Sequence, residues 1–192
     1  MALVEGALGG DRAAMDRLLR QHYDRVYAVC RRITGNDADA ADASQEALMS
    51  IVRSLGKFDG RSTLSTWVYR IATNASLDEL RRRRRRPVAI LDHDDHDERH
   101  SAGSGREDPT ALPRVEAVAD RLRLDAALAA IPEDFRVPIV LRDVADLDYA
   151  EIADTLGIPV GTVKSRIARG RAALAHQLRS GNRDDPSERP TN

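Results

Sequence analysis

The chain has 192 residues and a formal net charge of −1, from 30 Lys and Arg against 31 Asp and Glu. A nearly neutral chain of this length is not a simple polycation, and it is long enough for one or two domains with modest cores. The single cysteine, Cys30, excludes an internal disulfide, and its helical spacing from apolar neighbours predicts a buried structural thiol rather than a redox centre. No leader-like segment and no apolar run of membrane-spanning length is found, so we expect a cytoplasmic protein with no membrane insertion.

Apolar residues recur at helical spacing along most of the chain, and no alternating β-branched run predicts a strand. This periodicity predicts helices at residues 11–34, 37–56, 63–85, 115–131, 134–145, 149–156 and 160–178. Residues 87–114 are acidic, contain Gly and Ser, and carry few large apolar side chains, which is typical of a flexible linker. We therefore expect an all-α fold with two small helical domains, 1–86 and 115–179, joined by a flexible acidic linker, 87–114, and followed by a disordered tail, 180–192.

The helix expected at 37–56 has two different faces. Small and apolar residues, which permit close packing of another helix, lie on one side: Ala40, Ala43, Ala47, Ile51 and Leu55. Acids and an amide lie on the other side: Asp39, Asp42, Gln45 and Glu46. A polar face of this kind is often only solvated, but a fixed row of acids and amides also suits docking to a basic helix of a partner protein.

The helix expected at 63–85, with Ser62 as its N-cap, combines aromatic and basic residues. Its packing stripe consists of Leu64, Trp67, Val68, Ile71 and Ala75. The aromatics Phe58, Trp67 and Tyr69 precede Asn74, and the helix ends in an unbroken arginine run, 81–86. Rings beside amide and guanidinium groups fit an unpaired DNA strand, because a base can stack on a ring while arginines neutralise phosphates. A purely structural role of the aromatics is the alternative.

The stretch from Tyr149 to Leu178 predicts two helices joined by a tight turn. Asp148 is a suitable N-cap for the first helix, Gly157 ends it, and Pro159 suits the start of the second. The second helix has an apolar seam, formed by Val160, Val163, Ile167 and Leu174. Its polar and basic residues lie clear of that seam: Lys164, Ser165, Arg166, Arg169 and Arg171. This pattern indicates a helix-turn-helix with a DNA-facing recognition helix, and a helical hairpin with a solvated basic face is the alternative.

Metal and catalytic chemistry are not expected. His93, His96 and His100 lie among aspartates of the linker, but nothing apolar there would hold them as ligands, so a hydrated segment is the better interpretation. No phosphate-binding loop and no nucleophile with a paired base is found in the sequence. We therefore expect neither an enzyme nor a bound metal or cofactor.

Two motif blocks follow each other along the chain. The first is DADAADASQEALMSIVRSLGKFDG with STWVYRIATNASLDELRRR, and the second is LAAIPEDFRVPIVLRDVADLDYAEIADTLGIPVGTVKSRIARGRAAL. In this order they resemble bacterial RNA polymerase sigma factors of the extracytoplasmic-function (ECF) type, over about Gly10 to Leu178. The resemblance implies promoter-specific transcription initiation, with core RNA polymerase, promoter DNA and an anti-sigma protein as partners. A stand-alone helix-turn-helix regulator is the alternative, although it would usually dimerise on a palindrome and would leave the N-terminal half unexplained.

The resemblance also implies roles for individual residues. Core polymerase is bound by Asp39, Asp42, Gln45 and Glu46. The minus-10 element is read as a melted nontemplate strand by Phe58, Leu64, Trp67, Asn74 and Arg81. The minus-35 element is read as duplex by Lys164, Ser165, Ala168 and Arg169, while Arg166 and Arg171 hold phosphates. Leu64 stands where the family often has an aromatic and Ala168 where some members have a bulkier group, and both departures bear on promoter preference.

Overall fold

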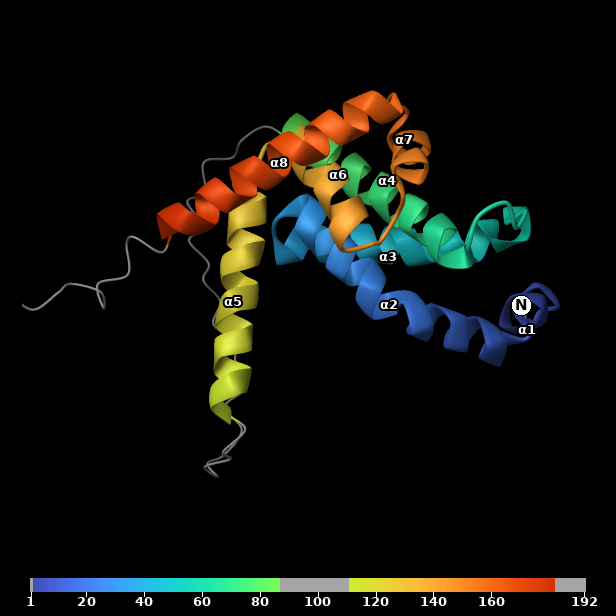
Figure 1. Cartoon of the computed structure of the whole chain (residues 1–192). Helices are drawn as coiled ribbons and strands as arrows, with labels where there is room; N and C mark the ends of the chain where they lie inside the picture. The colour runs from blue at the N-terminus through green and yellow to red at the C-terminus, as the bar shows by residue number, and fades with distance from the viewer. Residues whose placement is uncertain (1, 87–110, 182–192) are drawn as a thin grey trace, which may run out of the picture.

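The computed structural model describes residues 2–86 and 111–181, and every regular element in these ranges is helical (Figure 1). The α-helices are α1 (Ala2–Leu8), α2 (Arg12–Thr34), α3 (Asp37–Ser54), α4 (Leu64–Arg85), α5 (Ala111–Ala129), α6 (Glu133–Asp143), α7 (Tyr149–Leu156) and α8 (Val160–Gly181), and a short 3₁₀ helix, η1 (Leu55–Lys57), follows α3. The all-α prediction is confirmed. The segment 87–110, with its three histidines, and the tail beyond residue 181 lie outside the described residues. Among the described helices, no apolar stretch reaches membrane-spanning length.

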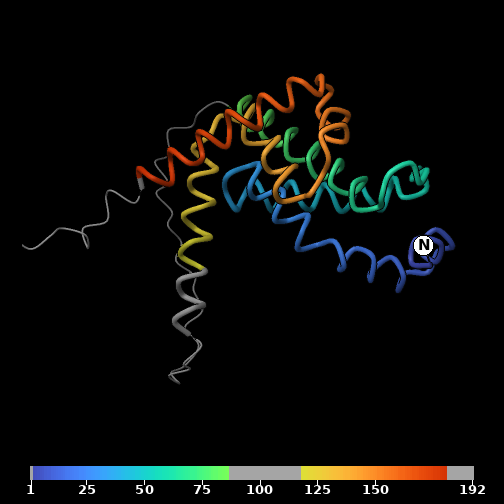
Figure 2. Tube along the Cα trace, viewed as in Figure 1, coloured from blue at the N-terminus to red at the C-terminus, as the bar shows by residue number. Residues whose placement is uncertain are grey.

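The helix at the start of each described range differs from expectation. Helix α1 was not predicted, because seven residues are too few to show a helical period, yet it buries Val4 and Ala7. It packs against the start of α2 and against η1, so that the N-terminus lies at the same end of the molecule as the loop after η1 (Figure 2). Helix α5 begins at Ala111 rather than at residue 115, because Pro113 is tolerated in the first turn of a helix.

The N-terminal cap of α4 is Thr63 and not Ser62, so that prediction is wrong. The Oγ1 of Thr63 accepts a hydrogen bond from the backbone N–H of Thr66 at 3.1 Å, which satisfies one of the free N–H groups at the helix start. The predicted cap of α7 is confirmed. Asp148 accepts from the N–H of Glu151, and Glu151 accepts in return from the N–H of Asp148, which forms a capping box.

Helices α2, α3 and α4 form the larger part of the core. The small-residue face of α3 is fully buried, and its alanines let α3 pack closely against α2 and α4. Cys30 of α2 is fully buried, as predicted, and burial raises the pKa of its thiol to about 11. A thiol in this environment is a small apolar core residue, since its thiolate form is strongly disfavoured at neutral pH.

Helices α7 and α8 form the helix-turn-helix, and α8 also lies across α6 (Figure 1). Val163 and Ile167 are buried as expected, but Val160 is 39% exposed, so its assignment to the buried seam is wrong. Gly170 is buried where α8 crosses α6, and a Cβ there would overlap the Cδ1 of Ile139 and lie 3.0 Å from the carbonyl oxygen of Phe135. At this glycine the backbone of α8 therefore packs directly against the Ile139 side chain of α6.

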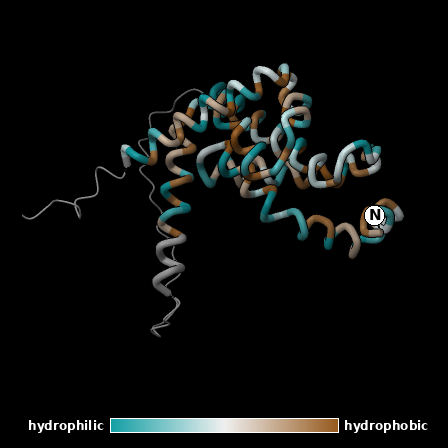
Figure 3. Tube along the Cα trace, in the orientation of Figure 1, coloured by the Kyte–Doolittle hydropathy of each residue, from teal (hydrophilic) through white to brown (hydrophobic). Residues whose placement is uncertain are grey.

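The two halves of the chain also pack on each other, which the sequence did not predict. Val137, Val140 and Leu141 of α6 and Ile152 of α7 belong to the same hydrophobic core as the buried residues of α2 to α4. Helix α2 contacts α5 and α6, and α4 contacts α7. Brown, hydrophobic segments alternate with teal ones along the helices, including α5, which projects from the body (Figure 3). Any function that needs the two halves apart must therefore separate a shared core.

Candidate nucleic-acid and partner interfaces

A groove runs between α3 and the C-terminal half of α4, and we call it the α3–α4 groove. It is lined by Asp42, Ala43, Gln45, Glu46, Met49, Ala75, Asp78, Glu79, Arg82, Arg85 and Arg86. Three of the four residues assigned to polymerase binding, Asp42, Gln45 and Glu46, are exposed on it together. Asp39 is not part of it. The carboxylate of Asp39 is only 13% exposed and accepts hydrogen bonds from Arg83 at 3.0 Å and from Asn36 at 2.7 Å.

The exposed acids of the groove have cations of the same chain as neighbours. Arg82 lies 3.7 Å from Asp42, and Arg53 lies 2.5 Å from Glu46. All four side chains are more than half exposed, so these pairs contribute little to stability and can be exchanged for the cations of a partner. Glu79 was missed by the sequence reasoning. Its side chain is buried beneath the groove and accepts a hydrogen bond from Arg82, and the i, i+3 spacing of the two residues was the available signal.

The aromatic residues assigned to the melted strand fall into two environments. Phe58 and Trp67 are half-buried neighbours, with ring centroids 5.6 Å apart and planes tilted by 56°, and Leu64 packs partly exposed on the same core. Tyr69 is 3% exposed, so its ring belongs to the core and the expectation that it joins the other two is wrong. The Phe58–Trp67 pair is thus the only aromatic platform that the described part of this loop and helix presents.

Two polar residues assigned to the same strand are exposed on α4. Asn74 lies seven residues after Trp67, which is about 10 Å along a helix. Arg81 is more than half exposed and donates to Asp78 at 2.6 Å. The structure therefore places the aromatic pair, the amide and the guanidinium in a row along α4 rather than in one compact pocket. Trp67, Asn74 and Arg81 are thus each about two helical turns apart on one side of α4.

Helix α8 divides its polar residues into two groups. Lys164, Ser165, Ala168 and Arg169 are exposed on the side away from the buried seam. Arg166 and Arg171 instead reach back to α6: Arg166 lies 3.3 Å from Asp134, and Arg171 donates to both oxygens of Asp143 at 3.2 and 2.5 Å. The bidentate contact with Asp143 raises the pKa of Arg171 above its ordinary value. These carboxylates are non-local partners and had no signal in the α8 sequence.

The first helix of the helix-turn-helix lies against α4. The Oγ1 of Thr66 donates to Glu151 at 3.0 Å, and Arg70 lies 3.4 Å from Asp154. Thr66 is adjacent to Trp67, and Arg70 lies one helical turn before Asn74. Helix α7 therefore covers part of the helix that carries the aromatic and amide row. Within residues 2–86 and 111–181, no cluster of His, Cys, Asp and Glu has the arrangement of a metal site.

Comparison with known proteins gives matches for both halves of the chain. Residues 18–86 match the Sigma-70 region 2 model, and residues 121–174 match the Sigma-70, region 4 model. The ECF RNA polymerase sigma factor SigE of Mycolicibacterium smegmatis is 42% identical over 176 residues, which are 88% of this chain and 64% of that protein. SigW of Bacillus subtilis, also named an ECF RNA polymerase sigma factor, is 36% identical over 183 residues, which are 88% of this chain and 91% of that protein.

Solved structures give the same fold. The sigma factor RpoE from Bartonella quintana, in its co-crystal structure with the anti-sigma factor NepR, superposes with a TM-score of 0.62 at 24% identity, over 85% of this chain and 96% of that chain. The fold and its two matched regions thus define a sigma-70-type factor that contains region 2 and region 4. The chain belongs to the ECF RNA polymerase sigma factors.

Proposed function

We propose that this sigma factor directs core RNA polymerase to its promoters by reading the minus-35 element as duplex and the minus-10 element as a melted nontemplate strand. Helix α8 reads the duplex, while the Phe58–Trp67 pair and Asn74 hold the melted strand. In this proposal the chain regulates transcription in the cytoplasm and catalyses no reaction of its own. Melting costs base-stacking energy, so the proposal needs both a partner that clamps DNA and a surface that holds unpaired bases.

The division of polar side chains on α8 supports duplex reading. Lys164, Ser165 and Arg169 are exposed and point away from the seam, whereas Arg166 and Arg171 are held by carboxylates of α6. Side chains on the open face of a helix can reach base edges in the major groove. Both ion pairs are partly exposed, so Arg166 and Arg171 can exchange these carboxylates for phosphates of the duplex.

The α3–α4 groove supports polymerase binding. It presents Asp42, Gln45 and Glu46 beside the exposed Met49, so an acidic rim lies next to an apolar side chain. This combination fits a partner helix that is basic on one side and apolar on the other, and we assign it to core RNA polymerase. One structural neighbour was crystallised with an anti-sigma factor, and we propose that an anti-sigma protein also controls this chain.

The experiment that tests the function is transcription in vitro with purified core polymerase and a library of promoter fragments. A sigma factor gives transcripts that begin at defined positions and depend on both the chain and core polymerase. A stand-alone regulator instead binds promoter duplex tightly and sequence-specifically without core polymerase. Specific duplex binding by the free chain, combined with no directed initiation, would overturn the proposal in favour of the regulator.

Polymerase docking has its own test. The double variant Asp42→Arg with Glu46→Arg should weaken core binding on the order of tenfold, because two rim charges that favour a basic partner become repulsive. Titration of labelled chain with core polymerase measures this. The matched control is Asp16→Arg with Asp24→Arg, which changes two exposed acids of α2 away from the groove. Equal affinities of the two double variants would show that the groove does not bind polymerase.

A further inference from the structure

Tyr149, the first residue of α7, lies beside one cation of α6 and one cation of α8. The guanidinium carbon of Arg142 is 5.4 Å from the centroid of its ring, and the ammonium nitrogen of Lys164 is 5.6 Å from it. The ring is 36% exposed, so it lies at the surface rather than in the core. Both distances are within the range in which a ring face attracts a cation.

Hydrogen bonds fix the backbone that carries this ring and the arginine beside it. Tyr149 follows Asp148 directly, and the capping box between Asp148 and Glu151 holds the backbone of the first turn of α7. Arg142 is half-buried at the end of α6 and donates to the carbonyl oxygen of Leu147 at 2.8 Å, so its guanidinium is anchored as well. Lys164 is exposed on α8, and its four-carbon side chain has the most rotatable bonds without a hydrogen-bonded anchor in the described part of the chain. The ring is therefore in a position to order the lysine, and not the reverse.

The second cation restricts the lysine further. Arg142 carries the same charge as Lys164 and lies at a similar distance from the same ring, so repulsion disfavours Lys164 rotamers that bring the ammonium close to the guanidinium. Attraction to the ring and repulsion from Arg142 together leave fewer conformations to a four-carbon side chain. A side chain that is ordered before binding loses less conformational entropy when it binds.

We propose that Tyr149 is a positioning residue for promoter recognition, whose ring holds the Lys164 ammonium at the DNA-facing side of α8. This inference rests on the proposed function, in which Lys164 contacts the duplex of the upstream element. The geometry assigns the role to the ring and not to the hydroxyl group, because both cations are placed against the ring. Tyr149 is thus a determinant of upstream-element preference that acts through Lys164.

The test uses holoenzyme assembled from the full chain and core polymerase, titrated against promoter duplexes with single base changes in the upstream element. The variants are Tyr149→Leu, Tyr149→Phe, Lys164→Ala, and the double variant of Tyr149→Leu with Lys164→Ala. Tyr149→Leu should lower the affinity for the preferred duplex by about two- to fivefold, which is the size of a surface cation–π contact. Tyr149→Phe should match wild type, and Tyr149→Leu should have no further effect once Lys164 is alanine.

Several outcomes would overturn the inference. Equal losses from Tyr149→Leu with and without Lys164 would mean that the ring supports the fold or contacts DNA directly. A loss from Tyr149→Phe would assign the role to the hydroxyl group, and a gain of affinity from Tyr149→Leu would mean that the ring holds the lysine back. If Lys164→Ala itself has no effect on the duplex panel, the assignment of Lys164 as a reader fails first, which is a distinguishable result.

A second measurement tests the position of the lysine without DNA. A methylene group beside a ring face gives upfield-shifted proton signals, so the ε-methylene protons of Lys164 should be shifted in the wild-type chain and in Tyr149→Phe. They should return to ordinary values in Tyr149→Leu. Thermal unfolding of all variants is measured alongside, and an unshifted lysine in the stable wild-type chain contradicts the inference.

Discussion

Helices α4 and α8 are the two proposed DNA readers, and they differ in how much of their surface the fold uses. Both have 22 residues and both are basic near their C-terminal ends. Eight residues of α4 are buried, because α2, α3 and α7 surround it. In the residues of α8 whose side chains are described, only Val163, Ile167 and Gly170 are buried, since α8 rests on one side against α5, α6 and α7.

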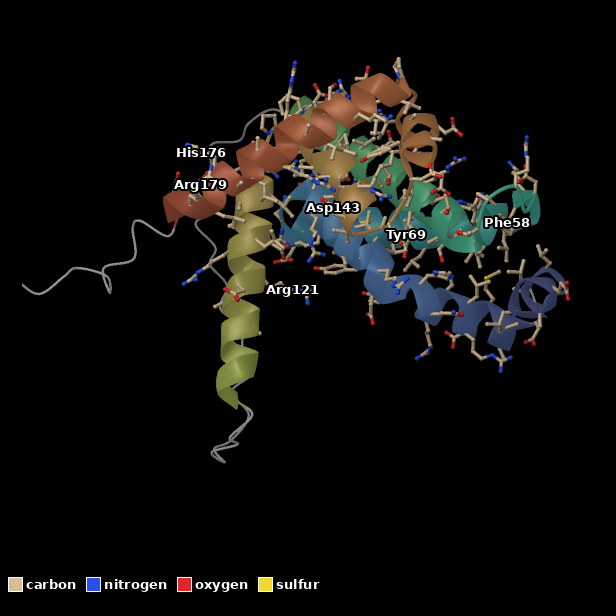
Figure 4. All side chains as sticks on the ribbon, in the orientation of Figure 1. Phe58, Tyr69, Arg121, Asp143, His176 and Arg179 are labelled. Atoms are coloured by element: carbon tan, nitrogen blue, oxygen red, sulfur yellow. The ribbon has the colours of Figure 1, made fainter. Side chains whose placement is uncertain are left out.

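The difference has a consequence for mutational analysis. On α4, the residues proposed to contact a melted strand share turns with core residues, as Trp67 does with Val68. A loss of function there can follow from a loss of stability. On α8, the open face that is proposed to read duplex is separate from the packing face, so a substitution on the open face should leave stability unchanged. The two regions lie far apart, since Phe58 and Arg179 of α8 are at distant ends of the molecule (Figure 4).

The largest effect is expected on α4. Trp67→Ala should lower the free energy of unfolding by about 3 kcal/mol, because a large half-buried ring leaves a cavity beside Phe58. It should also weaken binding of a single-stranded nontemplate oligonucleotide. Asn74→Ala removes an exposed side chain and should change stability by no more than about 0.5 kcal/mol. Chemical denaturation and oligonucleotide titration of the same preparations measure both quantities.

The pair of variants separates folding from recognition on α4. Asn74→Ala should impair open-complex formation at unchanged stability, which is the signature of a contact to a base. If Asn74→Ala binds the oligonucleotide and opens promoters like wild type, the amide does not hold a base. The proposed reading row then shrinks to the Phe58–Trp67 pair.

A smaller effect is expected where α8 crosses α6. Gly170→Ala should destabilise the chain by about 2 kcal/mol, because the new Cβ overlaps Ile139 and approaches the carbonyl oxygen of Phe135. Gly161→Ala is the matched control: its Cβ meets nothing within 4 Å, so greater helix propensity should stabilise α8 by up to about 1 kcal/mol. Thermal or urea unfolding compares the two. A neutral Gly170→Ala would show that α6 and α8 are not in close contact in solution.

Local sequence signals predicted the helices and the helix-turn-helix well. Asp148 and Gly157 mark the two ends of α7 as expected, and the alanine face of α3 is buried. Capping and periodicity are properties of a few neighbouring residues, so a single sequence contains them. The packing of α6 and α7 on the N-terminal half was not predictable in this way, because it depends on contacts between residues far apart in the chain.

The candidate site shows the same limit. The resemblance separated Lys164 and Arg169 from Arg166 and Arg171 on α8, but the ion pairs that hold the latter two against α6 were not predicted. Their partners are carboxylates of α6, which lie about thirty residues earlier in the chain. Tyr69 was misplaced for a related reason: an aromatic in a mixed helix can face the core or the surface, and only packing decides which.

The smallest effects are expected on the open face and at the end of α8. Arg169→Ala should lower the affinity for the preferred upstream element by about 1.5 kcal/mol and relax preference at one or two base positions, as expected for a base reader. Arg179 is exposed near the C-terminal end of α8. Arg179→Ala should weaken binding evenly across sequences and reduce the slope of affinity against salt by about one, as expected for a phosphate contact.

Titration of holoenzyme against a panel of upstream-element variants at several salt concentrations measures both effects. Arg121→Ala is the control of equal charge, since Arg121 is exposed on α5 and lies apart from α8 (Figure 4). Its affinities and salt slope should match those of wild type. If Arg169→Ala instead loses affinity equally for every duplex, Arg169 contacts phosphate. The proposed separation of base-contacting from phosphate-contacting residues on α8 would then be wrong. Like α4, α8 would then combine different functions on one surface.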